Sequence, residues 1–211
     1  MANENMINLH NTDCMKFMAD KPDNFYDLAI VDPPYGIDVN KMQLGSGKYK
    51  TDKKWDNNAP DELFFKELLR VSNNVILWGA NHYISKIPID SSCWLVWDKN
   101  NGTSDFADCE LAWTNLKKPV RKFVFGLQQQ DRVSIKFRFH PTAKPIKLYE
   151  WILLDHAKEG DKILDTHGGS GSICIACHNL KFDLDWCELD QDYFEAAKNR
   201  FEWHKAQLTL F

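Results

Sequence analysis

The feature that most constrains the fold of this chain is its alternation of short apolar runs with segments of helical periodicity. Residues 26–31, 74–78, 162–165 and 183–188 are short, β-branched or aromatic runs, and helical patterns lie between them at 61–71, near 81–87, at 146–156 and at 172–180. This alternation predicts an α/β fold with a mostly parallel sheet covered by helices on both faces. In such sheets ligands bind at the carboxyl ends of the strands.

Length and composition bound the class of protein. With 211 residues, of which 44% are hydrophobic and 27% charged, we expect one soluble domain over 1–211. The polar stretch 37–58 is long enough to predict a mobile substrate loop, and 101–139 is β-rich without a convincing helix. No apolar run has the length of a membrane span, and the six cysteines come without a signal peptide, so we expect a cytoplasmic protein.

The first candidate site is the stretch AIVDPPYGI at residues 29–37. Its apolar residues predict the end of a buried strand, which must stop because Pro33 and Pro34 cannot donate to a sheet ladder. Both prolines also hold the preceding residue extended. We therefore predict a rigid hook, formed by Asp32, Pro33, Pro34 and Tyr35, that presents a carboxylate, a carbonyl and an aromatic ring at a strand end.

The second candidate site is the glycine turn LDTHGGSGSICIACH, residues 164–178. A dinucleotide fingerprint fails because Cys174 stands at its third glycine position, and a phosphate loop fails because no Gly-Lys-Ser/Thr follows. Cys174, Cys177 and His178 match a haem-attachment spacing, but that chemistry needs an exported protein, and these cysteines lie in a predicted apolar helix. Ser170 lies where a hydrolase nucleophile would lie, but Ser172 stands where that motif needs glycine. A glycine turn before a helix favours a ligand carboxylate, and Glu188, 23 residues after Asp165, is placed for ribose. Carboxylate plus ribose without a phosphate loop describes S-adenosylmethionine.

Three motifs in one order resemble the β-class amino methyltransferases of DNA, whose DPPY hook precedes the cofactor loop. They are DPPY at 32–35, HPTAKP at 140–145 and DTHGGSG at 165–171. The resemblance implies a Rossmann-like methyltransferase fold with a circularly permuted motif order and a mostly parallel seven-stranded sheet. It makes 101–139 a short inserted target-recognition segment. It also implies a cofactor set without a metal, consisting of Asp13, Asp32, His140, Lys144, Asp165, His167, Gly168, Gly169, Ser170, Gly171 and Glu188.

The implied reaction is methyl transfer from S-adenosylmethionine to the exocyclic N6 of an adenine that has flipped out of a DNA duplex. The alternatives are cytosine N4 methylation and, from another class, a catalytically idle nucleic-acid-binding protein on the same fold. The sequence names no restriction endonuclease partner, and the short recognition segment leaves a homodimer open.

Charge is distributed unevenly along the chain. The net charge is -4, yet residues 115–147 carry nine Lys or Arg against one acid, and 41–54 carry five lysines against one acid. Such local basic segments favour binding of a polyanion. The candidate nucleic-acid-binding residues are Lys48, Lys50, Lys53, Lys54, Arg121, Lys122, Arg132, Lys136 and Arg138.

Overall fold

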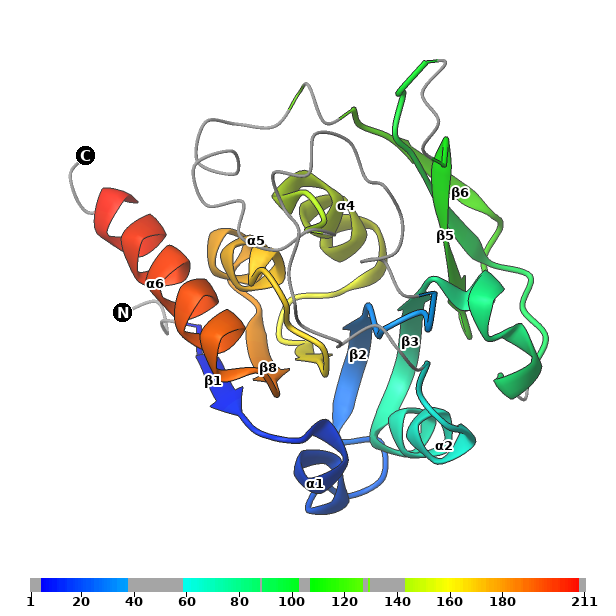
Figure 1. Ribbon diagram of the computed structural model, residues 1–211, viewed down its shortest axis with the longest axis horizontal. Coiled ribbons are helices and arrows are strands. Elements are labelled where there is room, and N and C mark those ends of the chain that lie inside the picture. Colours follow the sequence, from blue (N-terminus) through cyan, green and yellow to red (C-terminus); the bar gives the residue numbers. More distant parts are fainter. Residues whose placement is uncertain are drawn as a thin grey trace.

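The structure is a computed structural model that describes residues 5–37, 59–87, 89–102, 107–126, 129 and 143–208. The described residues form one sheet with helices on both of its faces (Figure 1). Its strands are β1 (Ile7–Asn11), β2 (Tyr26–Val31), β3 (Ser72–Trp78), β4 (Trp94–Asp98), β5 (Cys109–Thr114), β6 (Arg121–Val124), β7 (Lys162–Asp165) and β8 (Asp183–Glu188). Their order across the sheet is β1-β8-β7-β2-β3-β5-β4-β6.

The sheet is mostly parallel, as the sequence predicts. Only β5 runs antiparallel to its neighbours β3 and β4, whereas the other described pairs are parallel. The expected number of seven strands is too low by one in the described residues, because β6 pairs with β4 and extends the edge of the sheet. Since β5 lies between β3 and β4, part of segment 101–139 belongs to the sheet itself.

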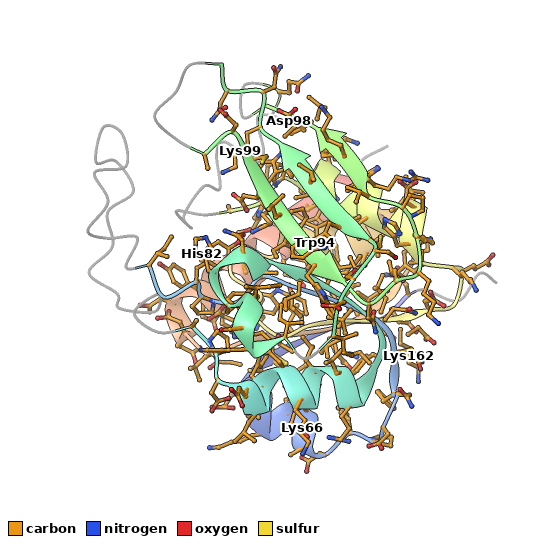
Figure 2. All side chains as sticks on the ribbon, turned by 90° about the vertical axis from the view of Figure 1, so that its right-hand side faces the viewer. Lys66, His82, Trp94, Asp98, Lys99 and Lys162 are labelled. Atoms are coloured by element: carbon orange, nitrogen blue, oxygen red, sulfur yellow. The ribbon has the colours of Figure 1, made fainter. Side chains whose placement is uncertain are left out.

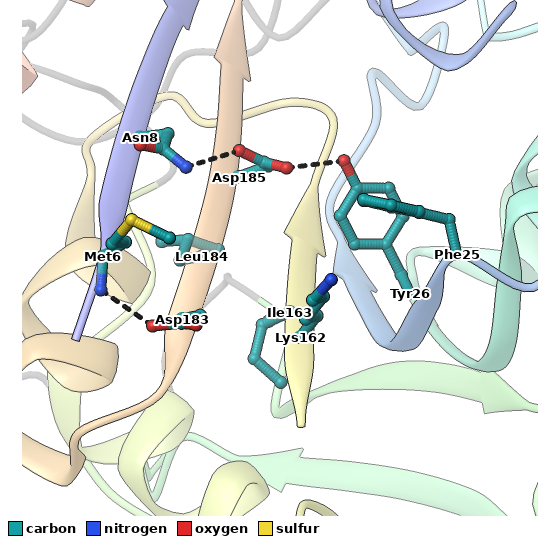
Figure 3. A pocket seen from close by; sticks show the side chains of 9 residues that line it. All are labelled: Met6, Asn8, Phe25, Tyr26, Lys162, Ile163, Asp183, Leu184 and Asp185. Atoms are coloured by element: carbon teal, nitrogen blue, oxygen red, sulfur yellow. Dashed lines mark hydrogen bonds between the residues drawn. The ribbon is translucent and has the colours of Figure 1, made fainter. Parts of the chain in front are cut away.

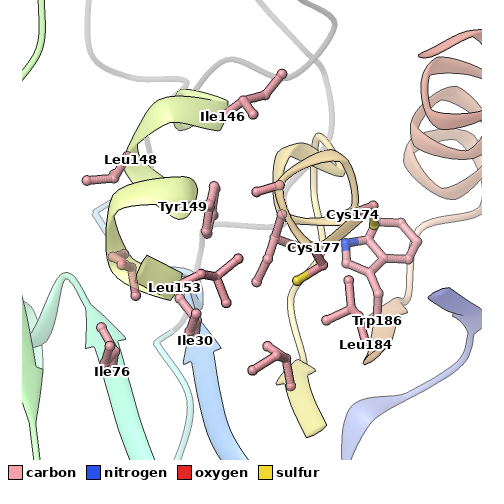
Figure 4. Close-up of a cluster of buried hydrophobic side chains, with 14 of the residues drawn as sticks. Ile30, Ile76, Ile146, Leu148, Tyr149, Leu153, Cys174, Cys177, Leu184 and Trp186 are labelled. Atoms are coloured by element: carbon pink, nitrogen blue, oxygen red, sulfur yellow. The ribbon is translucent and has the colours of Figure 1, made fainter. Parts of the chain in front are cut away.

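The helices are α1 (Cys14–Ala19), α2 (Glu62–Val71), α4 (Ile146–His156), α5 (Ser172–Leu180) and α6 (Gln191–Leu208). Successive strand residues point to opposite faces. On one face Leu28 and Ile30 pack with α4, α5 and α6, and Figure 4 shows Ile30 and Ile76 below α4, with Cys177 of α5 nearby. On the other face Ala29 and Val31 pack with α1 and α2.

The helix expected near residues 81–87 is instead a pair of 3-10 turns, η2 (Ala80–His82) and η3 (Ile84–Lys86). Three local features accompany the difference. Gly79 has a left-handed φ of 69°, and Tyr83 between the turns is not helical, with a φ of -141°. Pro88 also disfavours a helical conformation for the residue before it. Within the described ranges, no helix has the length and apolar character needed to cross a membrane.

The topology creates a switch point between β2 and β7, which are parallel neighbours. From β2 the chain continues through α2 to β3 on one side, and from β7 it continues through α5 to β8 on the other. Because α2 and α5 lie on opposite faces, the two connections diverge above the carboxyl ends of these strands. A crevice at that point is the usual ligand site of an open α/β sheet.

Candidate functional site

The DPPY hook lies at this switch point, directly after β2. Asp32 follows Val31, and the hydroxyl of Tyr35 donates a hydrogen bond of 2.6 Å to Asp32 Oδ1. The ammonium of Lys144, just before α4, forms an ion pair with Asp32 Oδ2 and donates to Tyr35 Oη at 3.2 Å. The prolines stop the strand as expected, so the carboxylate is held on a short, extended segment.

Tyr35 is fixed by its surroundings as well as by Asp32. Its ring is stacked on that of exposed His82, with centroids 4.9 Å apart and planes 15° from parallel. A Cβ on Gly79 would come within 2.0 Å of the Tyr35 ring, so only glycine fits there. The left-handed φ of Gly79 favours the same residue.

The glycine turn follows β7, beside the hook. Glu188, at the end of β8, accepts hydrogen bonds of 2.8 Å from the backbone N–H groups of Gly169 and Asp190. Gly168 donates to the carbonyl of Cys187 at 2.8 Å, and a Cβ on Gly168 would lie 1.8 Å from the indole of Trp186. The turn is therefore fixed against β8 with its backbone lying on an aromatic ring.

The amino terminus of α5 has no side-chain cap. Its N-cap is Gly171, which has no side chain to accept a hydrogen bond from the first N–H groups of the helix. Arg200, 3% exposed, supports the turn from below by donating to the carbonyl of Ser170 at 2.8 Å and to Ser172 Oγ at 3.0 Å. This arrangement fits a ligand carboxylate.

Two side chains of the turn, the buried Asp165 and the partly buried His167, have pKa values displaced by their surroundings. Burial raises the pKa of Asp165 to about 8, against the hydrogen bond that its carboxylate accepts from the backbone of His167. Burial lowers the pKa of His167 to about 4, although the nearby Asp13 carboxylate opposes this. At neutral pH the imidazole is therefore neutral, and the Asp165 carboxyl is ready to ionise beside a cationic group.

Asp13 and Glu188 lie on the same side of the turn. Asp13 caps α1 through Oδ1, which accepts from the backbone N–H groups of Met15 and Lys16. The preceding residue, Thr12, donates its N–H to the carbonyl of Glu188 at 3.1 Å. Asp13, Asp165, His167 and Glu188, which are separated in the sequence, therefore meet around the carboxyl ends of β1, β8 and β7.

Some predicted site residues are not gathered there. Arg121 and Lys122 are exposed on the edge strand β6, and Lys122 pairs with Asp98 at 3.2 Å. Outside the described residues lie His140, Lys48, Lys50, Lys53, Lys54, Arg132, Lys136 and Arg138.

Sequence reasoning missed three residues near the hook, namely His82, Glu110 and Lys99. Glu110, in β5, lies 3.1 Å from Lys144 Nζ and 2.8 Å from Lys99 Nζ. Lys99 follows the end of β4, as Figure 2 shows. One signal was present in the sequence, because Glu110 is an acid inside the otherwise apolar run CELAW.

A small pocket lies at the opposite end of the sheet (Figure 3). Its lining includes the first residues of three parallel strands, Tyr26, Lys162 and Asp183. Asp185 in this pocket already accepts hydrogen bonds from Asn8 and Tyr26. The pocket therefore offers a ligand fewer groups than the switch point does.

Comparisons with known proteins agree on one family. The model of a DNA methylase family matches residues 95–199. The chain is similar to the type II methyltransferase M.HpaI of Haemophilus parainfluenzae, with 25% identity over 90% of this chain and 73% of the relative. The M1.HpyAVI–SAM complex has a TM-score of 0.62 and 21% identity, covering 92% of this chain and all of that one. The cytosine-N4-specific PvuII DNA methyltransferase has a TM-score of 0.60 and 13% identity over 93% and 86%. These structural likenesses confirm the expected Rossmann-like fold.

Proposed function

This chain is a DNA methyltransferase of the N6/N4 DNA methylase family, and from that premise we propose that it transfers a methyl group from S-adenosylmethionine to the exocyclic N6 of adenine. The observation that carries the proposal is the placement of the DPPY hook and the glycine turn at the carboxyl ends of adjacent strands β2 and β7. A donor held at the turn would face a base held at the hook.

The hook would activate the target nitrogen. The lone pair of an adenine amino group is delocalised into the ring, and hydrogen bonds from its hydrogens to the Asp32 carboxylate and the Pro33 carbonyl would localise it. Positive charge develops on this nitrogen during transfer, and Asp32 stabilises it most at that stage. The nitrogen then gives up a proton to Asp32 or to solvent. The ring of Tyr35 would stack on the flipped base, which must leave its duplex to reach the hook.

The turn would hold the cofactor, which is the ligand in the M1.HpyAVI complex. S-adenosylmethionine would supply an electrophilic methyl group, whose bond to sulfur breaks as the bond to nitrogen forms. The amino terminus of α5, with Gly168, Gly169, Ser170 and Gly171, suits its carboxylate. Asp165 suits its ammonium, because a cation would favour the ionised form of this buried carboxyl. Glu188 suits the ribose hydroxyls, with Asp13 and His167 on the adenine side.

The position of Lys144 adds detail to the expected cofactor set. Its ammonium contacts Asp32, Glu110 and Tyr35, so Lys144 would act on the side chains of the hook. His140, which the resemblance also places on the methionine side of the cofactor, stays a prediction.

Cytosine N4 is the second candidate target, because the PvuII enzyme with a similar fold is cytosine-N4-specific. An acid before the two prolines favours adenine, since N4 enzymes of this family more often carry serine there. Methylating random-sequence DNA with labelled cofactor and separating the nucleosides would decide between the bases. Labelled N4-methylcytosine without N6-methyladenine would overturn the adenine proposal.

DNA would bind to the basic residues of two segments. These are the proposed substrate loop, 37–58, and the proposed target-recognition segment, 101–139. Lysine and arginine contacts to phosphates supply most non-specific affinity. Arg121 and Lys122 are exposed on β6, as such contacts require. A homodimer would double the contacts of the short recognition segment, and it stays a prediction.

The substitution Asp32→Asn tests the mechanism. We expect methyl transfer to fall at least 100-fold, as when a group acting on transition-state charge is removed. If Asp32 acts mainly on the base, the affinity for S-adenosylmethionine, measured by calorimetry, should change less than threefold. A threefold change corresponds to about 0.6 kcal/mol of binding free energy. Cofactor affinity that falls in step with activity would make Asp32 a cofactor ligand. Cofactor binding by the unaltered protein without transfer to any DNA would favour the idle nucleic-acid-binding alternative.

A further inference from the structure

Four charged side chains of alternating sign lead from the end of β4 to the hook. Lys99 Nζ lies 2.8 Å from Glu110 Oε1, and Glu110 Oε2 lies 3.1 Å from Lys144 Nζ without hydrogen-bond alignment. Lys144 Nζ then pairs with Asp32 Oδ2. The Lys144 side chain is only 2% exposed, so the centre of this row is cut off from water.

Burial sets the electrostatics of this row. It raises the pKa of Asp32, and the Lys144 ammonium works against that rise. Burial also works against the charge on Lys144, but the carboxylates of Asp32 and Glu110 outweigh it and raise the pKa of the ammonium. A buried carboxylate without a partner would take up a proton. A protonated Asp32 would no longer offer the negative charge that the proposed reaction needs.

We propose that Lys144 is a positioning residue of methyl transfer, which keeps Asp32 ionised and correctly oriented, while Glu110, neutralised by Lys99, fixes Lys144. The inference rests on the proposed function and extends it to residues outside the hook. Because Lys144 occupies Oδ2, the other oxygen, Oδ1, is the one that a substrate amino group would use in place of the Tyr35 hydroxyl. Lys144 contacts Tyr35 Oη as well, so one ammonium organises both side chains of the hook.

Other titratable groups face Asp32 and must be considered. Tyr35, Tyr83 and Tyr149 all have raised pKa values, chiefly through burial, so they stay neutral in the range of interest. Asp165 also faces Asp32 and titrates at about 8. Since Asp165 is present in every variant below, the inference is read from differences between the variants.

The test is the pH profile of single-turnover methyl transfer at saturating cofactor for the wild type, Lys144→Met, Glu110→Gln and the double variant. Methionine keeps the length of lysine without its charge. The acidic limb of the profile is the pH range in which activity rises as Asp32 ionises. Lys144→Met should move this limb to higher pH by about one to three pH units, so activity that is lost at neutral pH returns at higher pH. Glu110→Gln should leave that limb in place or move it slightly downward. The double variant should recover part of the loss, because Glu110 no longer opposes ionisation of Asp32.

The outcomes separate this inference from a packing role and from failure of the proposed function. If Lys144 only packs the hook, Lys144→Met will lose activity equally at every pH, and Glu110→Gln will restore none of it. A wild-type acidic limb in Lys144→Met would also overturn the inference. A wild type that methylates no DNA would instead reject the proposed function. Thermal melting of each variant identifies any that is unfolded. If Lys144→Met is unfolded, the double variant decides, because it leaves no Glu110 carboxylate without its Lys144 partner. An acidic limb still above that of the wild type then supports the inference, and a wild-type acidic limb contradicts it.

Discussion

Asp165 and His167 lie two residues apart in the glycine turn. Burial shifts their pKa values in opposite directions, up for the carboxyl of Asp165 and down for the imidazole of His167. Asp165 ionises at 3.8 in an unfolded chain and at about 8 in the fold. His167 loses its proton at 6.5 when unfolded and at about 4 in the fold. Between pH 4 and 6.5 the folded state holds one proton more at Asp165 and one fewer at His167, so the two effects on stability oppose each other.

Above pH 6.5 only the Asp165 effect of this pair remains, and its sign is clear. The folded state binds the extra proton, so stability falls as pH rises toward the folded pKa. The free energy of unfolding of the wild type should therefore fall between pH 6.5 and 8. In Asp165→Asn we expect this fall to be smaller by on the order of 1–2 kcal/mol. Denaturant unfolding of both proteins at several pH values measures the difference. Equal slopes would show that Asp165 is already ionised in the folded protein.

At the scale of an element, the turn between β7 and α5 is defined by contact between backbone and side chain. Gly168 rests on the indole of Trp186, and a methyl group there would meet three ring atoms at 1.8 to 2.3 Å. Trp186 is fully buried, so its ring cannot move into solvent. The glycine is therefore required for close approach.

Gly168→Ala should destabilise the protein by about 1–3 kcal/mol or more through overpacking, and should weaken cofactor binding because the turn moves. Gly160→Ala is the control, since its Cβ would meet nothing within 4 Å, although its φ of +87° carries a backbone cost. Thermal melting and cofactor calorimetry of both variants make the comparison. Cofactor affinity lowered equally by both changes would reject a special role for Gly168.

At the scale of the whole molecule, an acidic protein of net charge -4 is expected to bind a polyanion through local basic surfaces. Lys66 on α2 and Lys162 on β7 lie well apart from Lys99 and His82 in Figure 2, and both are exposed. They provide a matched comparison for Arg121 and Lys122, because replacing either pair removes two positive charges.

DNA affinity should fall steeply with salt, and each lost phosphate contact should reduce the slope of log affinity against log salt by about 0.9. We expect a flatter slope when Lys48, Lys50, Lys53 and Lys54 are replaced by glutamine together, and also for the pair Arg121→Gln and Lys122→Gln. The control pair Lys66→Gln and Lys162→Gln should leave it unchanged. A slope flattened equally by test and control pairs would point to net charge alone.

The features that could be predicted from the sequence are those set by interactions between residues close together in the chain. The strand ending at Val31 and the helix beginning after Asp61 follow from local rules, since prolines stop strands and an aspartate caps α2. The prediction of a helix near 81–87 was wrong. Gly79, which precedes this segment, has a left-handed conformation and lies against the ring of Tyr35, and this packing overrides the local helical preference. The apolar periodicity of residues 61–71 predicts Leu63 on the inward face of α2, together with Phe64 and Leu68. Leu63 is instead 62% exposed, because the packing of the helix on the sheet decides which side is buried.

The sequence by itself determined the local motifs of the candidate site: the hook at Asp32, the glycine turn after Asp165 and their order. These are short motifs whose geometry is set by neighbouring residues. Only the tertiary structure decided that β2 and β7 adjoin, and that Glu110 and Lys144 converge on Asp32. Contacts between residues 32, 110 and 144 depend on strand order and helix placement. A buried charge is stable only with a partner, and that partner is supplied by the fold.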